Sequence, residues 1–514
     1  MALTCVAGVL THAPRSAFCE RAPEHVVFVD AGSTGCRAHA FAVSASANGS
    51  GLFEMRTLGR KVKTASALAD MGGRVRAELI PAIQAAQAYI EDPRARDRAA
   101  VYVWATAGFR VLTPAKQQAL WREVREAVTS ETTLRHGHGH FRTVDGAEEG
   151  FYAWLAANYL SNVDVTAVGR LRDGASAPSA SAPFARLADS ENPLAKTVGA
   201  IDVGGGSVQY VALPHGGAGA VAKSMLELRD AVKVESFLGY GANHMETRWR
   251  RELARGGQTS NACAFPGHVV DVEGARLTGT GAYDECVRGL RKQIAAMQRE
   301  QKVTLRMPRD FAHVDRFLGM SLLFHLTNFI TVALPGALPS MPKASLSEIG
   351  DAGRRLCAIE WNKLLKDVDG KDPNTPTDRL NGRCFDAALV QALLGAEFDD
   401  DLKRDEVGLG FTQDDRRIDF IERIGGAEVE WTLGAAMSVI HPTAARANPA
   451  WAKTRVPTEC ARILHTSLLN EIYEWAIIIM PAAVIVTGYL VYKTIQAATN
   501  VATMARSPSF LEVL

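Results

Sequence analysis

The chain has 514 residues, with 57 basic and 56 acidic side chains and a formal net charge of +1. A hydrophobic content of 47% is enough for a large core, and the length predicts two or three domains. Because the charges nearly cancel and no long basic run is present, composition excludes an electrostatic footprint for nucleic acid. We therefore expect a substrate that is bound locally, in a cleft.

The N-terminal segment, residues 1–23, includes an apolar stretch, Ala2–Leu10. It lacks the charged leader and the cleavage pattern of a secretory signal, so export is not demonstrated by it. The first predicted strand, Val26–Val29, then leads into the glycine-rich loop Asp30–Arg37. A run of this kind followed by Asp-x-Gly is, on its own, more often an ordinary hairpin turn.

Strand-like and helical patterns alternate onward to about residue 160, which predicts an α/β fold. The helical patterns cover Arg76–Ile90 and Pro114–Thr129, with a strand-like run at Val101–Ala105 between them. The stretch Asp173–Ser190, rich in Ala, Ser and Pro, breaks this alternation and is typical of a flexible surface insertion.

A second strand and loop of matching plan follow, Val198–Ile201 and Asp202–Gln209. Two such loops, each ending in a polar group suited to phosphate, predict two phosphate-binding hairpins that face one another in two α/β units of related plan. Glycines let backbone amides approach phosphate oxygens closely. Asp30 and Asp202 would offer carboxylate oxygens to a divalent cation or to its bound waters.

Two further groups lie between the loops, 105–110 and 145–154. A carboxylate beside a phosphate site can take a proton from a water molecule that attacks a terminal phosphoryl group. Glu148 or Glu149 could serve. Taken alone, this acidic pair is more often a favourable charge pair at a helix N-terminus.

Trp475–Tyr492 contains no charged residue, and about 18 helical residues rise about 27 Å, close to the thickness of a bilayer core. We expect a membrane-spanning helix here; a buried core helix is the alternative. The other apolar stretch, Phe317–Leu334, is interrupted by polar residues and predicts a buried element of the globular part. With a short tail at 493–514, the catalytic part would be lumenal or extracellular, or would face the cytosol as a tail-anchored protein.

The eight cysteines are too few for a disulfide scaffold, but two pairs are spaced as plausible loop staples: Cys263 with Cys286, and Cys357 with Cys384. If paired, they indicate an oxidising compartment. Unpaired core thiols are the alternative.

Five motifs occur in an order that resembles one known family, the apyrases or ectonucleoside triphosphate diphosphohydrolases. They are DAGSTGCR at 30–37, ATAGFR at 105–110, GAEEGFYAWLAANYL at 146–160, IDVGGGSVQ at 201–209 and WTLGA at 431–435. Further agreement lies at 236–243, 261–263 and 384–394, so the resemblance covers about residues 25–440. The cysteine positions resemble those of disulfides in the family, which favours a lumenal compartment.

The resemblance implies a two-lobed actin-like ATPase (ribonuclease H-like) fold, with the active site in a cleft between the lobes. Lobe I would comprise 24–145 and about 426–465, and lobe II would comprise 146–425. It also implies hydrolysis of nucleoside tri- or diphosphates to the monophosphate and phosphate, with Ca²⁺ or Mg²⁺ and direct attack of water.

The motifs carry the family's roles onto particular positions. Glu149 takes the place of the general base, and Ser207 and Gln209 that of residues positioning the attacking water. Asp30 and Asp202 match groups that hold the metal through waters, and Asn158 and Trp431 match supporting residues. The expected phosphate-binding residues are Gly32, Ser33, Thr34, Gly35, Arg37, Thr106, Gly108, Arg110, Gly204, Gly205 and Gly206.

Some positions depart from the family. Cys36 stands inside the first loop where a small hydroxyl residue is common, and we expect a buried, inert thiol. Ala242 replaces a basic residue of some members, so their base contacts do not carry over. A kinase on the same fold or a non-catalytic nucleotide-binding membrane protein is the alternative function. The sequence assigns neither the preferred base nor triphosphate over diphosphate, nor an oligomeric state.

Overall fold

The structure, a computed structural model, describes residues 25–45, 53–137, 139–161, 197–214, 229–395 and 407–447. The described residues up to Thr443 belong to one compact unit, and the description below concerns this unit. The predicted insertion at 173–190 and the predicted span Trp475–Tyr492 lie outside the described residues. None of the described helices is both long enough and apolar enough to cross a bilayer.

The first sheet has five strands in the order β3-β2-β1-β4-β5. Its strands are β1 (His25–Gly32), β2 (Gly35–Ala45), β3 (Phe53–Lys63), β4 (Ala100–Ala105) and β5 (Phe141–Thr143). Strands β1, β2 and β3 pair antiparallel, whereas β4 and β5 continue the sheet from β1 in parallel. Apolar side chains on both faces of β1 are buried, as expected for a central strand of a covered sheet.

The second sheet repeats this plan. Its strands are β6 (Gly199–Val203), β7 (Ser207–Ala212), β8 (Lys233–Leu238), β12 (Phe317–Ser321) and β13 (Ile418–Phe420), in the order β13-β12-β6-β7-β8. Strands β6, β7 and β8 pair antiparallel, and β12 and β13 extend the sheet from β6 in parallel. The prediction of two α/β units of related plan is therefore confirmed, with β1 and β6 in equivalent places.

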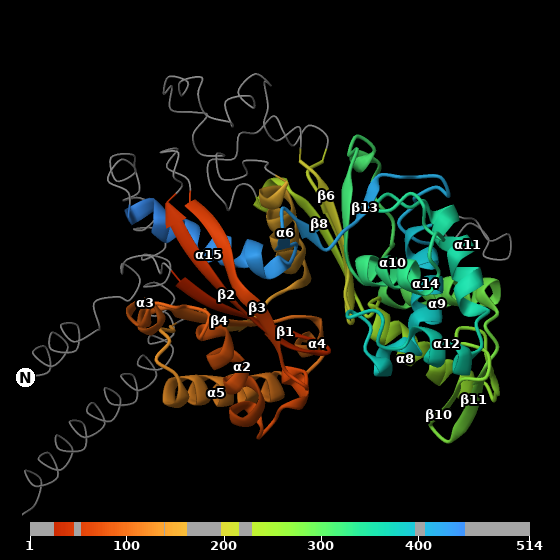
Figure 1. Cartoon of the computed structure of the whole chain (residues 1–514), viewed down its shortest axis with the longest axis horizontal. Helices are drawn as coiled ribbons and strands as arrows, with labels where there is room; N and C mark the ends of the chain where they lie inside the picture. The colour runs from red at the N-terminus through yellow and green to blue at the C-terminus, as the bar shows by residue number, and fades with distance from the viewer. Residues whose placement is uncertain are drawn as a thin grey trace, which may run out of the picture. The chain divides into compact units, whose positions relative to one another are not determined.

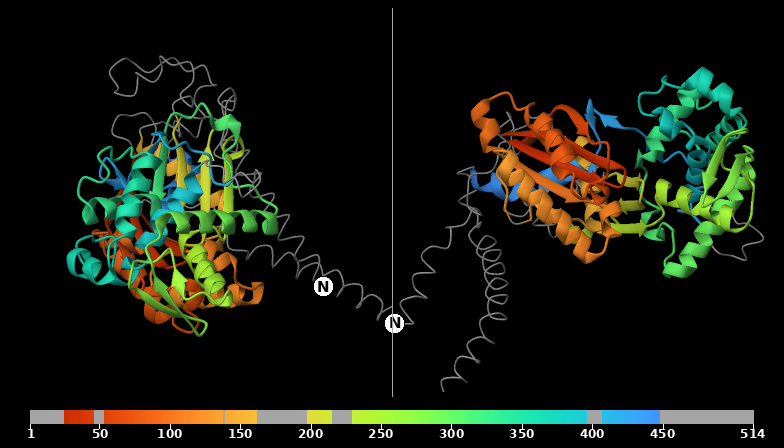
Figure 2. Two further views of the ribbon diagram at one scale, coloured as in Figure 1. Left: turned by 90° about the vertical axis from the view of Figure 1, so that its right-hand side faces the viewer. Right: turned by 90° about the horizontal axis from the view of Figure 1, so that it is seen from below.

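Helices cover the first sheet on both faces. On one face lie α2 (Val75–Gln87) and α5 (Pro114–Glu131), whose buried residues join the strands in one apolar cluster (Figures 1 and 2). From the other side, α15 (Trp431–Ala447) packs Trp431 edge-on against Phe28 of β1 at 5.9 Å. Two short helices, α3 (Pro93–Arg98) and α4 (Ala107–Arg110), and the 3₁₀ turn Leu68–Asp70 complete this part.

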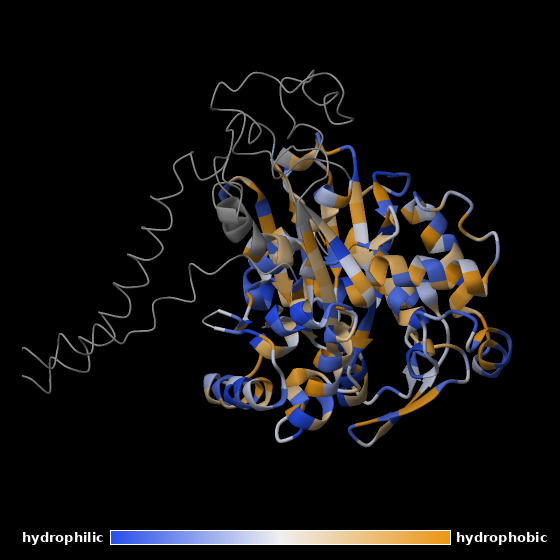
Figure 3. Ribbon diagram, turned by 60° about the vertical axis from the view of Figure 1, so that its left-hand side comes forward, coloured by the Kyte–Doolittle hydropathy of each residue, from blue (hydrophilic) through white to orange (hydrophobic). Residues whose placement is uncertain are grey.

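The second sheet is covered by α6 (Gly146–Leu160), which packs on β6, β7 and β8, and by helices clustered on its other face (Figure 1). These are α8 (Ala242–Arg255), α9 (Tyr283–Gln301), α10 (Leu322–Ala333), α11 (Leu346–Cys357), α12 (Trp361–Val368), α13 (Thr377–Leu380) and α14 (Arg383–Leu394). Hydrophobic and hydrophilic residues alternate around these helices, and their apolar sides form the larger core (Figure 3). The remaining elements are small: β9 (Ser260–Asn261), β10 (Val269–Val272), β11 (Ala275–Gly279), a 3₁₀ turn at Arg309–Phe311, β14 (Arg423–Ile424) and β15 (Ala427–Glu428).

Both predicted disulfides are present, Cys263–Cys286 and Cys357–Cys384. The first joins the loop after β9 to α9, and the second joins the end of α11 to the start of α14. The stretch Phe317–Leu334 is confirmed as a buried element, since it forms β12 and α10 within the core.

Candidate active site

The two glycine-rich hairpins lie against one another. Strands β1 and β2 remain paired down to Gly32 and Gly35, which leaves Ser33 at the tip of a tight turn. A Cβ added to Gly108 would lie 2.7 Å from Ser33 Cα, and one added to Gly205 would lie 2.6 Å from Ser33 Oγ. A Cβ at position 108 would therefore collide with the backbone of Ser33, whereas one at position 205 would displace its hydroxyl. The first loop, the start of α4 and the second loop thus meet at one point.

Backbone hydrogen bonds from the start of α8 hold the second loop in shape. Ala242 N donates to Gly204 O at 2.9 Å, and Asn243 N donates to Gly205 O at 3.0 Å. Gly206 O accepts from Gly239 N at 2.8 Å. Within the loop, Gly204 N donates to Ser207 O at 3.0 Å, so backbone bonds fix its path from both ends.

Adjacent acidic residues at the start of α6 have different roles. Glu148 forms a capping box with Asp145: its backbone N–H donates to Asp145 Oδ1 at 2.7 Å, and its own carboxylate accepts from Asp145 N. The Glu148 carboxylate is also bound by Arg142 at 2.9 Å. Helix capping and this ion pair therefore account for Glu148.

Glu149 instead points into the site. Its Oε2 accepts from Arg110 Nη2 at 2.5 Å and from Gln209 Nε2 at 3.2 Å. Gln209 Nε2 also lies 2.8 Å from Ser207 Oγ and 3.4 Å from Ser236 Oγ. A carboxylate, an amide and a hydroxyl from two segments of the chain are thus joined in one hydrogen-bonded chain.

The electrostatics of Glu149 suit proton transfer. Burial raises the pKa of Glu149 to about 8; Arg110 opposes this shift, whereas Asp202 and Asp30 add to it. A carboxyl group with a pKa close to neutrality can accept a proton and later release it at ordinary pH.

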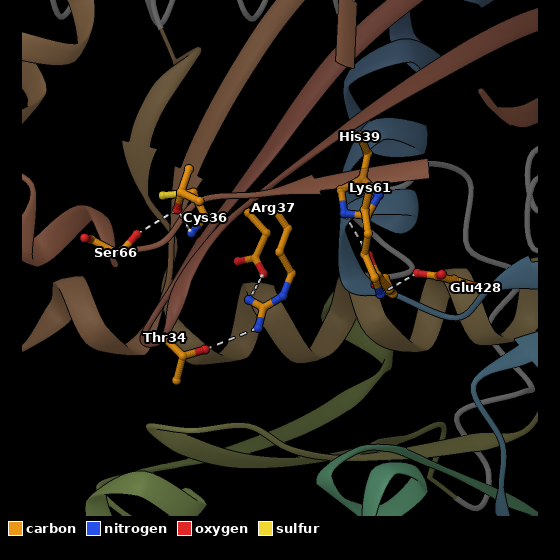
Figure 4. Close-up of polar contacts among 10 residues, drawn as sticks. Thr34, Cys36, Arg37, His39, Lys61, Ser66 and Glu428 are labelled. Carbon is orange, nitrogen blue, oxygen red and sulfur yellow. Dashed lines mark hydrogen bonds and ion pairs between the residues drawn. The ribbon is translucent and has the colours of Figure 1, made fainter. Parts of the chain in front are cut away.

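Asp30 and Asp202 supply two further buried carboxylates. Arg37 Nη1 lies 3.2 Å from Asp30 Oδ2, and Arg37 Nη2 donates to Thr34 Oγ1 at 3.3 Å (Figure 4). Oδ1 of Asp30 and Oδ1 of Asp202 are both buried without a hydrogen-bond partner among the described residues. Burial raises the pKa of each carboxyl, and each interacts electrostatically with Glu149.

Comparison with known proteins decides the family. Residues 17–457 match the GDA1/CD39 (nucleoside phosphatase) family. The chain belongs to this family. A nucleoside-triphosphatase of Caenorhabditis elegans is 25% identical over 80% of this chain and 72% of its own length. The Golgi apyrase of Schizosaccharomyces pombe is 24% identical over 66% of this chain and 59% of its own length. A solved structure of nucleoside triphosphate hydrolases from Neospora caninum has 15% identity and a TM-score of 0.49, covering 90% of this chain and 98% of that one.

Of the residues predicted from the motifs of the GDA1/CD39 family, most lie in or beside this cluster. Two lie away from it. Asn158, fully buried, donates to Trp154 O at 2.9 Å and accepts from Val198 N at 2.8 Å, so it ties α6 to the strand that carries Asp202. Trp431 packs against Phe28 of β1, which lies two residues before Asp30 in the sequence.

The donor set fits a cation held mainly through water. No group of three His, Cys, Asp or Glu side chains able to hold a metal occurs within the described ranges. The two unpartnered Oδ1 atoms of Asp30 and Asp202 are hard oxygen ligands, and Mg²⁺ in particular keeps several waters when few carboxylates are offered.

A partly buried ion cluster near Asp30 was missed from the sequence. Glu430 Oε2 lies 2.9 Å from His39 Nε2, and Glu430 Oε1 lies 2.6 Å from Lys61 Nζ. Lys61 Nζ also binds Glu428 at 2.6 Å (Figure 4). Burial opposes ionisation of Glu430, but His39 and Lys61 hold its pKa well below the usual range. The only sequence signal was the position of Glu430 directly before the WTLGA motif.

Among the described residues, Cys36 is the single free cysteine, and its thiol is buried. Burial raises the pKa of Cys36 to about 12. Because the thiolate is the reactive form, this side chain is inert at ordinary pH, in agreement with the expectation from the sequence.

Proposed function

We propose that this chain hydrolyses nucleoside tri- and diphosphates to the monophosphate and phosphate, by direct attack of water and with a divalent cation. Membership of the GDA1/CD39 family makes it a nucleoside phosphatase, and therefore a hydrolase. One observation carries the mechanism: Glu149 Oε2 is held 3.2 Å from Gln209 Nε2, which in turn lies 2.8 Å from Ser207 Oγ.

In this mechanism Glu149 is the general base. A water molecule placed between its carboxylate and the terminal phosphoryl group gives a proton to Glu149 and attacks phosphorus, while the bond from phosphorus to the bridging oxygen breaks and the shortened nucleotide leaves with that oxygen. Ser207 and Gln209 orient that water through the hydroxyl and the amide. No side chain forms a bond to phosphorus, so we expect no phosphoenzyme.

The phosphates are held by backbone amides of the two glycine-rich hairpins. The contact of Ser33 with Gly205 supports a shared binding place for both loops, because the loops converge there. Arg37, beside Asp30 and Thr34, adds positive charge to the first loop. Arg110 acts in two ways, since it holds Glu149 in the free protein and its guanidinium is available to phosphate oxygens.

Asp30 and Asp202 would hold the cation through its water shell. When bound, Ca²⁺ or Mg²⁺ neutralises charge that develops on the phosphate oxygens. The cation would also offset the repulsion that both aspartates exert on an ionised Glu149. The base is then ionised over more of the physiological pH range.

The comparisons also support a substrate range and a compartment for this proposal. One similar protein is named a nucleoside-triphosphatase and another an apyrase of the Golgi, which supports tri- and diphosphates as substrates and an endomembrane lumen as the compartment. The disulfides Cys263–Cys286 and Cys357–Cys384 support an oxidising surrounding. The uncharged segment Trp475–Tyr492 supports attachment to a membrane by one helix.

A panel of ATP, ADP, UDP and GDP with the purified full chain tests the proposal. We expect phosphate release from several of them without any added acceptor, in Ca²⁺ or Mg²⁺, and loss of release in excess chelator. Release that required an acceptor molecule would indicate a kinase, and binding without release would indicate a non-catalytic protein. Activity unaffected by chelator would exclude the cation from the mechanism.

A further inference from the structure

Ser321 has an unusual backbone conformation next to the candidate active site. It ends β12 and directly precedes α10, with φ of 53° and ψ of −117°. The other non-glycine residues with positive φ in the described part of the chain are Glu273, in the turn between β10 and β11, and Lys302, the C-cap of α9. Both places commonly require such a conformation, but the junction of β12 with α10 does not. A serine with these angles is strained.

The hydroxyl of Ser321 also does not form the hydrogen bond that an N-cap residue usually makes. Ser321 is the N-cap residue of α10, yet no side-chain capping bond forms. Ser345, the N-cap residue of α11, shows the usual arrangement: φ is −77°, and its hydroxyl accepts from Glu348 N at 3.2 Å. The two N-cap serines therefore differ: Ser345 caps its helix through the hydroxyl, and Ser321 does not.

The register of the second sheet places Ser321 beside the strand that carries Asp202. In the parallel pairing of β12 with β6, Met320 lies opposite Asp202, and Ser321 lies opposite Val203. In a regular strand Ser321 would point to the face away from Asp202, because successive side chains alternate. The positive φ interrupts this alternation. Burial raises the pKa of Asp202, and a side-chain hydrogen bond with Ser321 acts against this shift.

We infer that Ser321 is a positioning residue for Asp202, whose strained backbone is retained because it directs the hydroxyl at that carboxylate. The bond fixes the orientation of Asp202 and leaves Oδ1, which has no partner among the described residues, free for the waters of the cation. Outer hydrogen bonds of this kind change metal affinity or activity by about 10- to 100-fold in other proteins. The inference rests on the cation role given to Asp202 in the proposed function.

Three variants of the full chain test it. Ser321→Gly removes both the strain and the hydroxyl, Ser321→Ala removes the hydroxyl alone, and Ser345→Ala is the matched control at an ordinary cap. Thermal unfolding is followed with no ligand, and then during a Ca²⁺ titration at a fixed concentration of a non-hydrolysable ATP analogue. The second measurement gives the Ca²⁺ concentration at half of the maximal rise in Tm, without reference to turnover.

For Ser321→Gly we expect a ligand-free Tm about 1 to 4 °C above wild type, because glycine adopts this backbone without strain. Ser321→Ala should show no such rise. In both variants the half-maximal Ca²⁺ concentration should increase about tenfold or more, and kcat/KM should fall by a similar factor. Ser345→Ala should lower Tm while leaving the Ca²⁺ midpoint and kcat/KM unchanged.

The outcomes separate this inference from the proposed function. A wild-type protein without any Ca²⁺-dependent rise in Tm would exclude the cation role of Asp202, and the role of Ser321 with it. A wild-type response shared unchanged by both Ser321 variants would overturn the inference alone. A Tm lowered equally by Ser321→Gly and by Ser345→Ala would show that Ser321 is an ordinary helix cap.

Discussion

The two phosphate hairpins occupy equivalent places in sheets of one topology, but they are held in different ways. In the first, Asp30 lies opposite Arg37 across the strand pair, and in the second Asp202 lies opposite Gln209. Arg37 therefore neutralises Asp30 from within its own hairpin. Asp202 has no ion-pair partner in the portion of the chain that the structure describes. Its hairpin is held by backbone bonds from α8, and its carboxylate by the hydroxyl of Ser321.

Because of this difference, we expect the two hairpins to have different functions in the site. In the first hairpin Arg37 already compensates the charge of Asp30, so this carboxylate depends less on a cation. The second brings an uncompensated buried carboxylate, which is costly unless a cation or a proton joins it. Gln209, which stands where the first hairpin has Arg37, is neutral and turns toward Glu149 instead. We therefore expect the second hairpin to carry the chemistry and most of the cation dependence.

The largest effect should come from Glu149→Gln. The amide cannot take a proton from water, so kcat should fall by roughly a hundredfold or more while nucleotide binding is kept. Steady-state kinetics with ATP and ADP, together with a binding titration, measure the two quantities separately. Glu148→Gln is the control: its amide oxygen can still accept from Asp145 N, but the ion pair with Arg142 is lost, so Tm should fall slightly and kcat should change less than about threefold. An equal loss of kcat in both variants would remove Glu149 from the role of base.

The different roles of the adjacent residues Glu148 and Glu149 can be predicted only in part from the sequence. The glycine loops, the acidic pair and the cysteine spacing are local patterns, and the order of the motifs assigned Glu149 by resemblance. The remainder depends on contacts between distant segments. Glu430 reaches Lys61 across a separation of 369 residues, and Ser321 reaches Asp202 only because β12 pairs with β6. Apart from the position of Glu430 directly before the WTLGA motif, no local pattern marks either residue, because strand register and crossover connections depend on segments that are far apart in the sequence.

The second-largest effect is on the cation requirement, and it allows the two hairpins to be compared directly. Asp202→Asn should raise the cation concentration for half-maximal activity about tenfold or more, whereas Asp30→Asn should raise it less, because Arg37 already offsets the charge of Asp30. Initial rates over a series of Mg²⁺ and Ca²⁺ concentrations at saturating ATP give both midpoints. A larger increase of this cation concentration for Asp30→Asn would show that the first hairpin, not the second, carries most of the cation dependence.

The smallest effect is on stability and depends on pH. In the folded protein burial raises the pKa of Glu149 from 4.5 to about 8, so the folded state binds a proton that the unfolded chain releases. This stabilisation is complete below about pH 4.5 and is lost as the pH rises toward 8. Glu149→Gln removes the titration, so the ligand-free variant should exceed wild type in Tm by a few degrees near pH 8.5, with the excess shrinking as the pH falls toward 4.5.

The same measurement distinguishes the hairpins once more. Both aspartates raise the pKa of Glu149, and Asp202 does so more than Asp30. Asp202→Asn should therefore flatten the fall of Tm with pH more than Asp30→Asn does. Thermal unfolding of wild type and the three variants between pH 4.5 and 8.5, without nucleotide and in chelator, gives the slopes. Equal slopes in the two asparagine variants would show that neither aspartate has the stronger influence on the base, and an unchanged slope in Glu149→Gln would assign the titration to another group.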